Sequence, residues 1–189
     1  MKILFFDVET TGVLPNKHGI HQISGEIQID GETKEQFNLK VRPNPKAEIT
    51  PEALEVGGVT LEQIMAYPPM EEVFPQFISM LSKYVDRYNK KDKFFLCGYN
   101  NASFDNNFLR GWFLQNGDRY FGSWFWANSI DVMVLATPFL ANVRSNMENF
   151  KLATVALACG INVEDDKLHD ASYDIYLTKE IYKTVTGTK

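Results

Sequence analysis

One stretch of the sequence decides the fold that we expect, and it reads Ile3-Leu4-Phe5-Phe6-Asp7-Val8-Glu9-Thr10-Thr11-Gly12. Residues 2–8 are mostly apolar, which is typical of a strand that is buried on both faces of a sheet. The chain then turns at Thr10-Thr11-Gly12. Asp7 and Glu9 are two residues apart, so on a strand their side chains leave the same face, about 6.5–7 Å apart along the backbone.

Two carboxylates at the end of a buried strand need compensation. Burial disfavours the charged form of each acid, and each charge repels the other. A divalent cation is the economical way to offset both costs. The alternative interpretation is a strand that ends in solvent, where both acids are simply hydrated.

The segments that follow predict a mixed α/β sheet with helices packed against it. Apolar residues at even spacing between His21 and Asp30 indicate a half-buried strand, the Asp30-Gly31 pair is typical of a hairpin turn, and the returning strand carries Phe37, Leu39 and Val41. The first three strands should therefore form an antiparallel meander. Residues 93–99 predict another buried strand, and Thr50 with Pro51 predicts a helix start. Further helices are expected at about 70–88, 104–116, 130–137, 148–159 and 170–185.

Length and composition favour one domain, residues 1–189. At 189 residues and 44% hydrophobic composition, the chain should bury roughly 70% of its unfolded surface, which excludes extensive disorder. No apolar run approaches the ~20 residues of a membrane span, and the first residues do not fit a signal peptide, so we expect a cytoplasmic protein without membrane contacts. Cys97 and Cys159 are expected as buried free thiols of a reducing compartment.

The net charge of −5, from 24 acidic and 19 basic residues, limits how this protein could bind nucleic acid. A protein that neutralises phosphates over a broad surface is usually basic. If this chain acts on phosphodiesters, we expect it to rely on a few local basic side chains and on bound cations.

Two more acids and a histidine stand at the ends of predicted elements. Asp105 follows the buried strand 93–99 and lies in the first turn of a helix, at the kind of strand end where α/β sheets place ligands. Asp174 lies near the start of the last helix, and His169 precedes it by five residues. Together with the two acids of the first strand, they could meet at one edge of the sheet.

This set of side chains suits phosphodiester hydrolysis with metal ions. Mg²⁺ or Mn²⁺, two ions per site about 3.5–4 Å apart, prefer carboxylate oxygens, activate a water and stabilise the leaving oxygen. A histidine with a pKa near ~6.5 can accept the proton of that water at neutral pH. The cations would also allow an acidic protein to act on an anionic substrate.

Three motifs stand in order along the chain: Phe6-Asp7-Val8-Glu9-Thr10-Thr11-Gly12, Asn101-Ala102-Ser103-Phe104-Asp105-Asn106-Asn107-Phe108-Leu109, and His169-Asp170-Ala171-Ser172-Tyr173-Asp174. They resemble the motifs of the DEDDh (DnaQ-like) 3′–5′ exonucleases, a family that includes the proofreading epsilon subunits of bacterial DNA polymerase III and RNase T-type enzymes. The H-x-A-x-x-D form of the third motif resembles the histidine subtype. The resemblance spans nearly the whole chain, and three motifs in this order are highly specific.

The resemblance implies a ribonuclease H-like fold, in which helices flank a five-stranded mixed sheet whose short fifth strand lies around Ser123–Ser129. It also implies that Asp7, Glu9, Asp105 and Asp174 bind the metal ions and that His169 is the general base. The residues implied to contact the 3′-terminal nucleotide are Thr10, Thr11, Gly12, Leu14, Asn101 and Phe104, with Gly12 allowing a tight turn. Many relatives have His where this chain has Asn100, a position outside the implied metal ligands.

The function that we expect is that of a 3′–5′ exonuclease. It should act on single-stranded or frayed 3′ ends of DNA or RNA and release nucleoside 5′-monophosphates, in proofreading or repair. RNA 3′-end processing by an oligoribonuclease or RNase T-like enzyme is the alternative, because the contacts that sense the 2′-hydroxyl cannot be assigned. A DNA polymerase subunit fits as a partner, although no residue names it. We expect distributive digestion that declines with salt.

Two other classes of protein fit less well. A haloacid-dehalogenase-like phosphatase has a D-x-D-x-T motif after an apolar strand, but here the second acid is Glu9, and hairpin strands follow where that fold has a crossover helix. A catalytically silent module that binds a polymerase would have lost a metal ligand, whereas all five key positions are present in this sequence.

The remaining candidates are predicted to be structural. His18 and His21 are expected as surface or loop histidines, because no cysteine or acid accompanies them at zinc-ligand spacing. Asp131 is expected to cap a helix. The aromatic residues between 112 and 126 are expected to pack in the core rather than to stack on bases.

Overall fold

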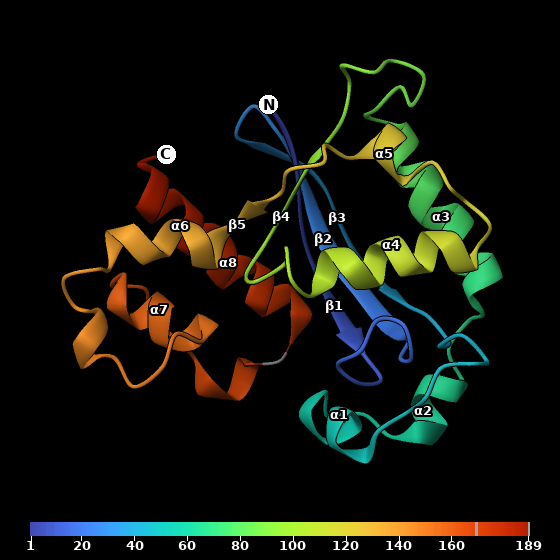
Figure 1. Cartoon of the computed structure of the whole chain (residues 1–189), viewed down its shortest axis with the longest axis horizontal. Coiled ribbons are helices and arrows are strands. Elements are labelled where there is room, and N and C mark those ends of the chain that lie inside the picture. Colours follow the sequence, from blue (N-terminus) through green and yellow to red (C-terminus); the bar gives the residue numbers. More distant parts are fainter. Residues whose placement is uncertain (169, 189) are drawn as a thin grey trace.

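The computed structural model describes residues 1–168 and 170–188, and it shows a five-stranded mixed sheet with helices on both faces (Figure 1). The strands are β1 (Lys2–Thr10), β2 (Ile20–Ile29), β3 (Glu32–Lys40), β4 (Phe95–Gly98) and β5 (Ile130–Asp131). Their order across the sheet is β3-β2-β1-β4-β5. The first three strands form the antiparallel meander that the sequence predicts, and β4 pairs parallel to β1, as β5 does to β4.

β1 is central because both of its faces are apolar over most of its length. Leu4, Phe6 and Val8 belong to one core, and Ile3 and Phe5 belong to the other, all at most 4% exposed. The predicted strand with two buried faces is therefore confirmed. The alternation ends at the last residues of β1, where acids replace the apolar side chains of the second face.

Different helices cover the two faces. One face packs against α3 (Met70–Ser82) and α4 (Asp105–Gln115), and the short α5 (Phe121–Trp124) extends the same core. The other face packs against α6 (Val132–Phe139), α7 (Leu152–Ala158) and α8 (Ala171–Thr186). Beyond these layers lie α1 (Pro51–Val56), α2 (Leu61–Met65) and two 3₁₀ turns, Arg144–Asn146 and Asp165–Lys167. Among the described residues, no helix is both long and apolar enough to cross a bilayer.

The predicted aromatic packing is confirmed in the first core. Phe113 meets the rings of Phe74 and Phe121 edge to face, with centroids 4.9 Å and 5.1 Å away. Trp112 and Trp124 are 2% and 1% exposed. These aromatic side chains therefore fill the space between the sheet and its first helical layer.

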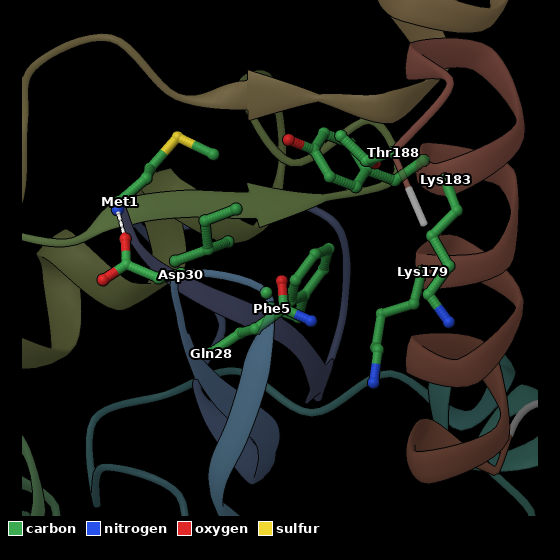
Figure 2. A pocket seen from close by; sticks show the side chains of 10 residues that line it. Met1, Phe5, Gln28, Asp30, Lys179, Lys183 and Thr188 are labelled. Carbon is green, nitrogen blue, oxygen red and sulfur yellow. Dashed lines mark hydrogen bonds and ion pairs between the residues drawn. The ribbon is translucent and has the colours of Figure 1, made fainter.

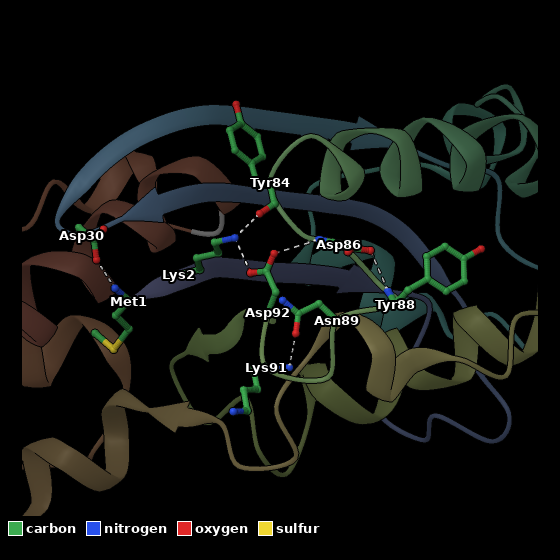
Figure 3. Close-up of polar contacts among 9 residues, drawn as sticks. All are labelled: Met1, Lys2, Asp30, Tyr84, Asp86, Tyr88, Asn89, Lys91 and Asp92. Carbon is green, nitrogen blue, oxygen red and sulfur yellow. Dashed lines mark hydrogen bonds and ion pairs between the residues drawn. The ribbon is translucent and has the colours of Figure 1, made fainter.

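A partly buried ion pair connects the loop after α3 to the first strand. Lys2 of β1 bonds both the carboxylate of Asp92 and the backbone carbonyl of Tyr84, and Asp92 in turn accepts a hydrogen bond from the backbone N–H of Asp86 at 3.1 Å (Figure 3). This clamp lies at the start of β1, at the far end of that strand from its two acids.

Two expectations need correction. The helix expected over 70–88 ends at Ser82, because the chain turns there and Val85 reaches the core from the turn rather than from a helical stripe. The fifth strand exists, but it is Ile130–Asp131 rather than Ser123–Ser129; within the expected range, Phe125 makes a single isolated bridge to Phe94.

Candidate active site

The two acids of the first motif lie at the carboxyl end of β1, on the face that α8 covers. In the β1–β2 ladder Asp7 pairs with Ser24 and Glu9 with Gln22, and the register shifts directly after Glu9. Both acids are half-buried. Their strand geometry is therefore the one that the D-x-E spacing predicts.

Asp105 reaches the same place from another element. It is the first residue of α4, its side chain is 4% exposed, and its Oδ1 accepts a hydrogen bond from the backbone N–H of Val8 at 3.1 Å. Since Val8 stands between Asp7 and Glu9, this bond holds the third carboxylate beside the first two.

The turn that delivers Asp105 is built around Asp131, at the end of β5. The carboxylate of Asp131 accepts hydrogen bonds from the backbone N–H groups of Asn100, Ala102 and Met133, at 3.0, 3.3 and 3.0 Å. Asn100 has a φ of +60°, which asparagine tolerates better than most residues. Asp131 caps α6 as predicted, and it also fixes the turn between β4 and α4, a second task that the sequence did not reveal.

Asp174 comes from the first turn of α8. Asp170 caps the start of that helix, because its side chain accepts hydrogen bonds from the N–H groups of Ser172 and Tyr173 at 3.0 and 3.1 Å. The charge of Asp174 acts on both Asp7 and Glu9. Four carboxylates from three elements therefore converge on one volume.

The proximity of the acids changes their protonation. Burial raises the pKa of Asp7 well above its ordinary value, and the carboxylates of Asp105, Glu9 and Asp174 raise it further. Burial, followed by Asp174 and Asp105, raises the pKa of Glu9 to about 7 against an opposing effect of Lys40. Burial also raises the pKa of Asp105 to about 7, although its hydrogen bond from Val8 opposes the change. The carboxylates of Asp105 and Asp174 thus disfavour the charges of both Asp7 and Glu9.

The donor set fits hard divalent cations. Carboxylate oxygens are the ligands that Mg²⁺ and Mn²⁺ prefer, and a cation would offset both the burial of these charges, which is the main cause of the raised pKa values, and the repulsion between them. Within residues 1–168 and 170–188, no three His, Cys, Asp or Glu side chains already stand in the arrangement of a metal site. A bound ion would therefore require these carboxylates to rotate toward it.

The residues expected to contact the terminal nucleotide fall into two groups. Leu14 is 46% exposed, and Phe104 is half-buried against the ring of Phe108, with centroids 5.0 Å apart. Thr11 and Asn101 are fully buried; Thr11 accepts from the N–H of Gly19 at 3.0 Å, and Asn101 donates to Asn106 at 3.3 Å. The first pair can meet a ligand, whereas the second pair supports the turns around the site.

Thr10 and Gly12 shape the turn that follows β1. The hydroxyl of Thr10 donates to the carbonyl of Gly12 at 2.8 Å. A Cβ on Gly12 would lie 2.5 Å from the imidazole of His18, a distance that real side chains do not adopt. His18 in turn accepts the backbone N–H of Leu14 at 2.9 Å. Glycine is therefore required at position 12 because the His18 ring packs against the turn.

The expectation of surface or loop histidines at positions 18 and 21 is only partly right, because His18 lies in the loop between β1 and β2, whereas His21 lies on β2. His18 is 6% exposed and His21 is fully buried. Burial and the charge of Lys40 lower the pKa of His21 to about 4. The ring of His18 packs against the turn at Gly12, and the ring of His21 lies near Gly57 at the end of α1, contacts that leave no spacing signal in the sequence. His169, the predicted general base, lies outside the described residues.

A cavity of about 310 Å³ lies at the other end of β1 (Figure 2). Phe5, Gln28, Lys179 and Lys183 are among its lining residues, and the two lysines reach toward it from α8. It lies beside the first half of β1, and none of the four acids lines it, so it is not part of the candidate site.

The comparisons with known proteins identify the class. The family model RNase_T, described as Exonuclease, matches residues 4–182. The chain therefore belongs to this exonuclease family, and the resemblance carried by the three motifs is confirmed.

Relatives come from bacterial DNA polymerases. A DNA polymerase III PolC-type protein of Thermotoga petrophila is 27% identical over 177 residues, which cover 93% of this chain and 11% of that protein. A DNA polymerase III subunit epsilon of Pasteurella multocida is 25% identical over 193 residues, which cover 97% of this chain and 68% of that protein. The chain thus spans about a tenth of the PolC-type relative.

Solved structures share the fold. Escherichia coli Exonuclease I in complex with a dT13 oligonucleotide superposes with a TM-score of 0.75 at 21% identity, covering 98% of this chain and 41% of that one. A zinc-bound form of an E. coli ExoI–ssDNA complex gives a TM-score of 0.77 at 21% identity, with 100% and 41% covered. The expected ribonuclease H-like fold with a five-stranded mixed sheet is therefore confirmed.

Proposed function

We propose that this exonuclease-family chain removes nucleotides from the 3′ end of single-stranded or frayed DNA and releases nucleoside 5′-monophosphates. The observation that carries the proposal is the convergence of Asp7, Glu9, Asp105 and Asp174 on one volume, where Asp105 and Asp174 raise the pKa values of both Asp7 and Glu9. So many carboxylates in one partly buried place are costly unless cations join them. The names of the relatives support DNA as the substrate.

In the proposed reaction the four carboxylates hold the cations, and the scissile phosphate comes to lie against them. Two bound Mg²⁺ or Mn²⁺ ions would polarise the attacking water and offset negative charge on the phosphate. The water oxygen forms a bond to phosphorus while the bond from phosphorus to the 3′ oxygen of the preceding nucleotide breaks. His169 takes the proton of the water, in the role that its motif implies.

The terminal nucleotide is proposed to lie between the turn after β1 and the start of α4. Leu14 offers an exposed apolar surface on that turn, and Val13 beside it is 72% exposed. Phe104 offers a half-buried ring directly before Asp105. Apolar groups on both sides of a base suit stacking on any nucleobase, as a proofreading enzyme without sequence preference requires.

A panel of labelled oligonucleotides tests this function. DNA and RNA strands carrying a 3′ or a 5′ label are incubated with Mg²⁺, Mn²⁺ or EDTA. We expect the 3′ label to leave at once as a mononucleotide and the 5′-labelled strand to shorten one nucleotide at a time, only with metal. Release of the 5′ label as the first mononucleotide, or equal rates in EDTA, would contradict the proposal.

Variants assign the reaction to the four acids. Asp7→Ala should remove nearly all activity, whereas Glu71→Gln, on an exposed position of α3, should leave it unchanged. If a 3′-mismatched primer is then extended by a bacterial DNA polymerase only when the wild-type chain is present, a proofreading role with a polymerase partner is supported.

A further inference from the structure

The outer part of the sheet has an unusual face beside the acids. On the side that α8 covers, β2 and β3 present polar residues where a core would be apolar: Gln22, Ser24, Glu26 and Gln28 on β2, and Gln36, Asn38 and Lys40 on β3. Those on β2 are all at most 9% exposed. Buried polar side chains in such a row are costly unless they are hydrogen-bonded or serve a ligand.

The row nearest the acids runs straight across three strands. Glu9 pairs with Gln22, and Gln22 pairs with Lys40. Neighbouring strands lie about 4.8 Å apart, so Lys40 stands roughly 10 Å from Glu9 on the same face. Its ammonium donates to the side-chain carbonyl of Gln22 and lies 5.8 Å from the ring centroid of Tyr67. The charge of Lys40 also acts on Glu9 and on Asp170.

A groove continues from this row between β3 and the first half of α8. Its volume is about 360 Å³, and its lining includes Gln36, Asn38, Ser172 and Tyr176. Gln22 donates to Asn38 at 3.0 Å, which joins the groove to the Lys40 row. The groove therefore starts at Asn38, one hydrogen bond away from the Lys40 row, and leads away from the acids over the polar strands.

The chemistry of this groove suits one strand of nucleic acid. Amide and hydroxyl groups can bond phosphate and sugar oxygens, and the phenol ring of Tyr176, 50% exposed, offers a face for a base. The groove also contains Glu26, but Lys179 pairs with that carboxylate, and Thr33 and Gln36 donate to it at 2.5 and 2.8 Å. Lys40, by contrast, is bonded to an amide, so its positive charge remains available to a phosphate.

We propose that Lys40 and the groove between β3 and α8 hold the nucleic-acid strand on the 5′ side of the scissile phosphate. Phe104, the proposed neighbour of the terminal base, follows β4 on one side of β1, whereas Lys40 lies two strands away on the other side. A strand that crosses the acids would thus have its last nucleotide on the β4 side and its remainder along β3. This inference rests on the proposed exonuclease function and assigns that site a binding track.

The test compares a substrate that has an upstream strand with one that lacks it. The p-nitrophenyl ester of thymidine 5′-monophosphate has a scissile phosphate but no preceding nucleotides. An oligo(dT) 12-mer has a scissile phosphate and a strand of nucleotides on its 5′ side. For Lys40→Gln and Tyr176→Ala we expect the ratio of kcat/KM on the 12-mer to kcat/KM on the ester to fall about tenfold, the usual worth of one charge-assisted bond or one stacked base. Lys34→Gln, at the exposed far end of β3, should keep the wild-type ratio.

Salt dependence gives a second readout that a purely structural role would not move. Fluorescence anisotropy of the labelled 12-mer in Ca²⁺ measures binding over a range of salt. Lys40→Gln should reduce the slope of log K against log salt by about 0.7, the value for one phosphate contact to a single strand.

The possible outcomes test the exonuclease proposal and the binding track separately. A wild-type chain without activity on either substrate would refute the exonuclease proposal and the track with it. If the wild type is active but Lys40→Gln lowers kcat/KM equally on both substrates, or leaves the salt slope unchanged, the track alone is overturned. Equal losses on both substrates would assign Lys40 to the acid cluster. A falling ratio together with a lower slope supports the track.

Discussion

Replacing Asp105 by asparagine should make the metal-free protein more stable while it disables metal binding. Asp105 is 4% exposed, and its pKa stands at about 7 instead of 3.8. Each tenfold change in proton affinity corresponds to about 1.4 kcal/mol. Keeping this carboxylate ionised in the fold at pH 8 therefore costs up to about 4 kcal/mol, and the neutral amide of the Asp105→Asn variant would avoid that cost while still accepting the hydrogen bond from Val8.

The sign of the pH dependence follows from the direction of the pKa change. An acid whose pKa is raised in the fold binds its proton more tightly there than in the unfolded chain, so its ionisation lowers stability as the pH rises from about 4 to about 7. Below pH 4 both states carry the proton, and the advantage of the Asp105→Asn variant should shrink to less than about 1 kcal/mol. Above pH 7 the advantage should level off.

Thermal and urea unfolding in EDTA at pH 8 and pH 4 measure this effect. For a chain of this size a gain of about 4 kcal/mol corresponds to a rise in Tm of roughly 8–16 °C. Addition of Mg²⁺ or Mn²⁺ should then raise the Tm of the wild type much more than that of the variant. An Asp105→Asn variant that is equally stable or less stable than the wild type at pH 8 in EDTA would refute the electrostatic reasoning.

Three further changes have distinct expected results. Asp131→Asn should lower the free energy of unfolding by about 1–3 kcal/mol in a urea titration, the opposite sign to Asp105→Asn, because an amide oxygen cannot accept all three N–H groups that the carboxylate accepts; a gain in stability would argue against its role in the turn. Gly12→Ala should cost about 1–3 kcal/mol in the same measurement, since the new methyl group would meet the ring of His18 at 2.5 Å; an unchanged midpoint would show that the loop moves freely. His169→Ala should lower turnover ~10²–10⁴-fold with nearly normal Mn²⁺ affinity, and a collapse of that affinity would make His169 a metal ligand instead of a base.

Local patterns predicted most of what positions the site. The apolar run before Asp7 placed β1 at the centre of the sheet, and the D-x-E spacing placed two acids on one face. The burial of residues 93–99 and the helix start after them placed Asp105 at the end of β4. These features depend on residues that are close in sequence, so a single chain reveals them.

Other features depend on contacts between distant segments. β5 has two residues, too few for an alternating pattern, and the more apolar stretch before it packs in the aromatic core instead. His18 and His21 gave no sign of burial, because residues far away in the sequence lie against them: Glu48 forms a bridge with His18, and Gly57 lies near the ring of His21. Likewise, the polar face of β2 looked like a solvent-facing one, and only the fold places α8 over it.

Mn²⁺ titration of the wild-type chain by calorimetry, in two buffers of different ionisation heat at pH 7, addresses the joint role of the four acids most directly. Because the pKa values of Glu9 and Asp105 stand at about 7, these acids are partly protonated there, and ions that bind them must displace protons. We predict about two Mn²⁺ per chain, with release of about one proton, and a large loss of affinity in Asp7→Asn and Glu9→Gln. Binding without proton release, or binding that both substitutions leave intact, would contradict a metal site made from these carboxylates.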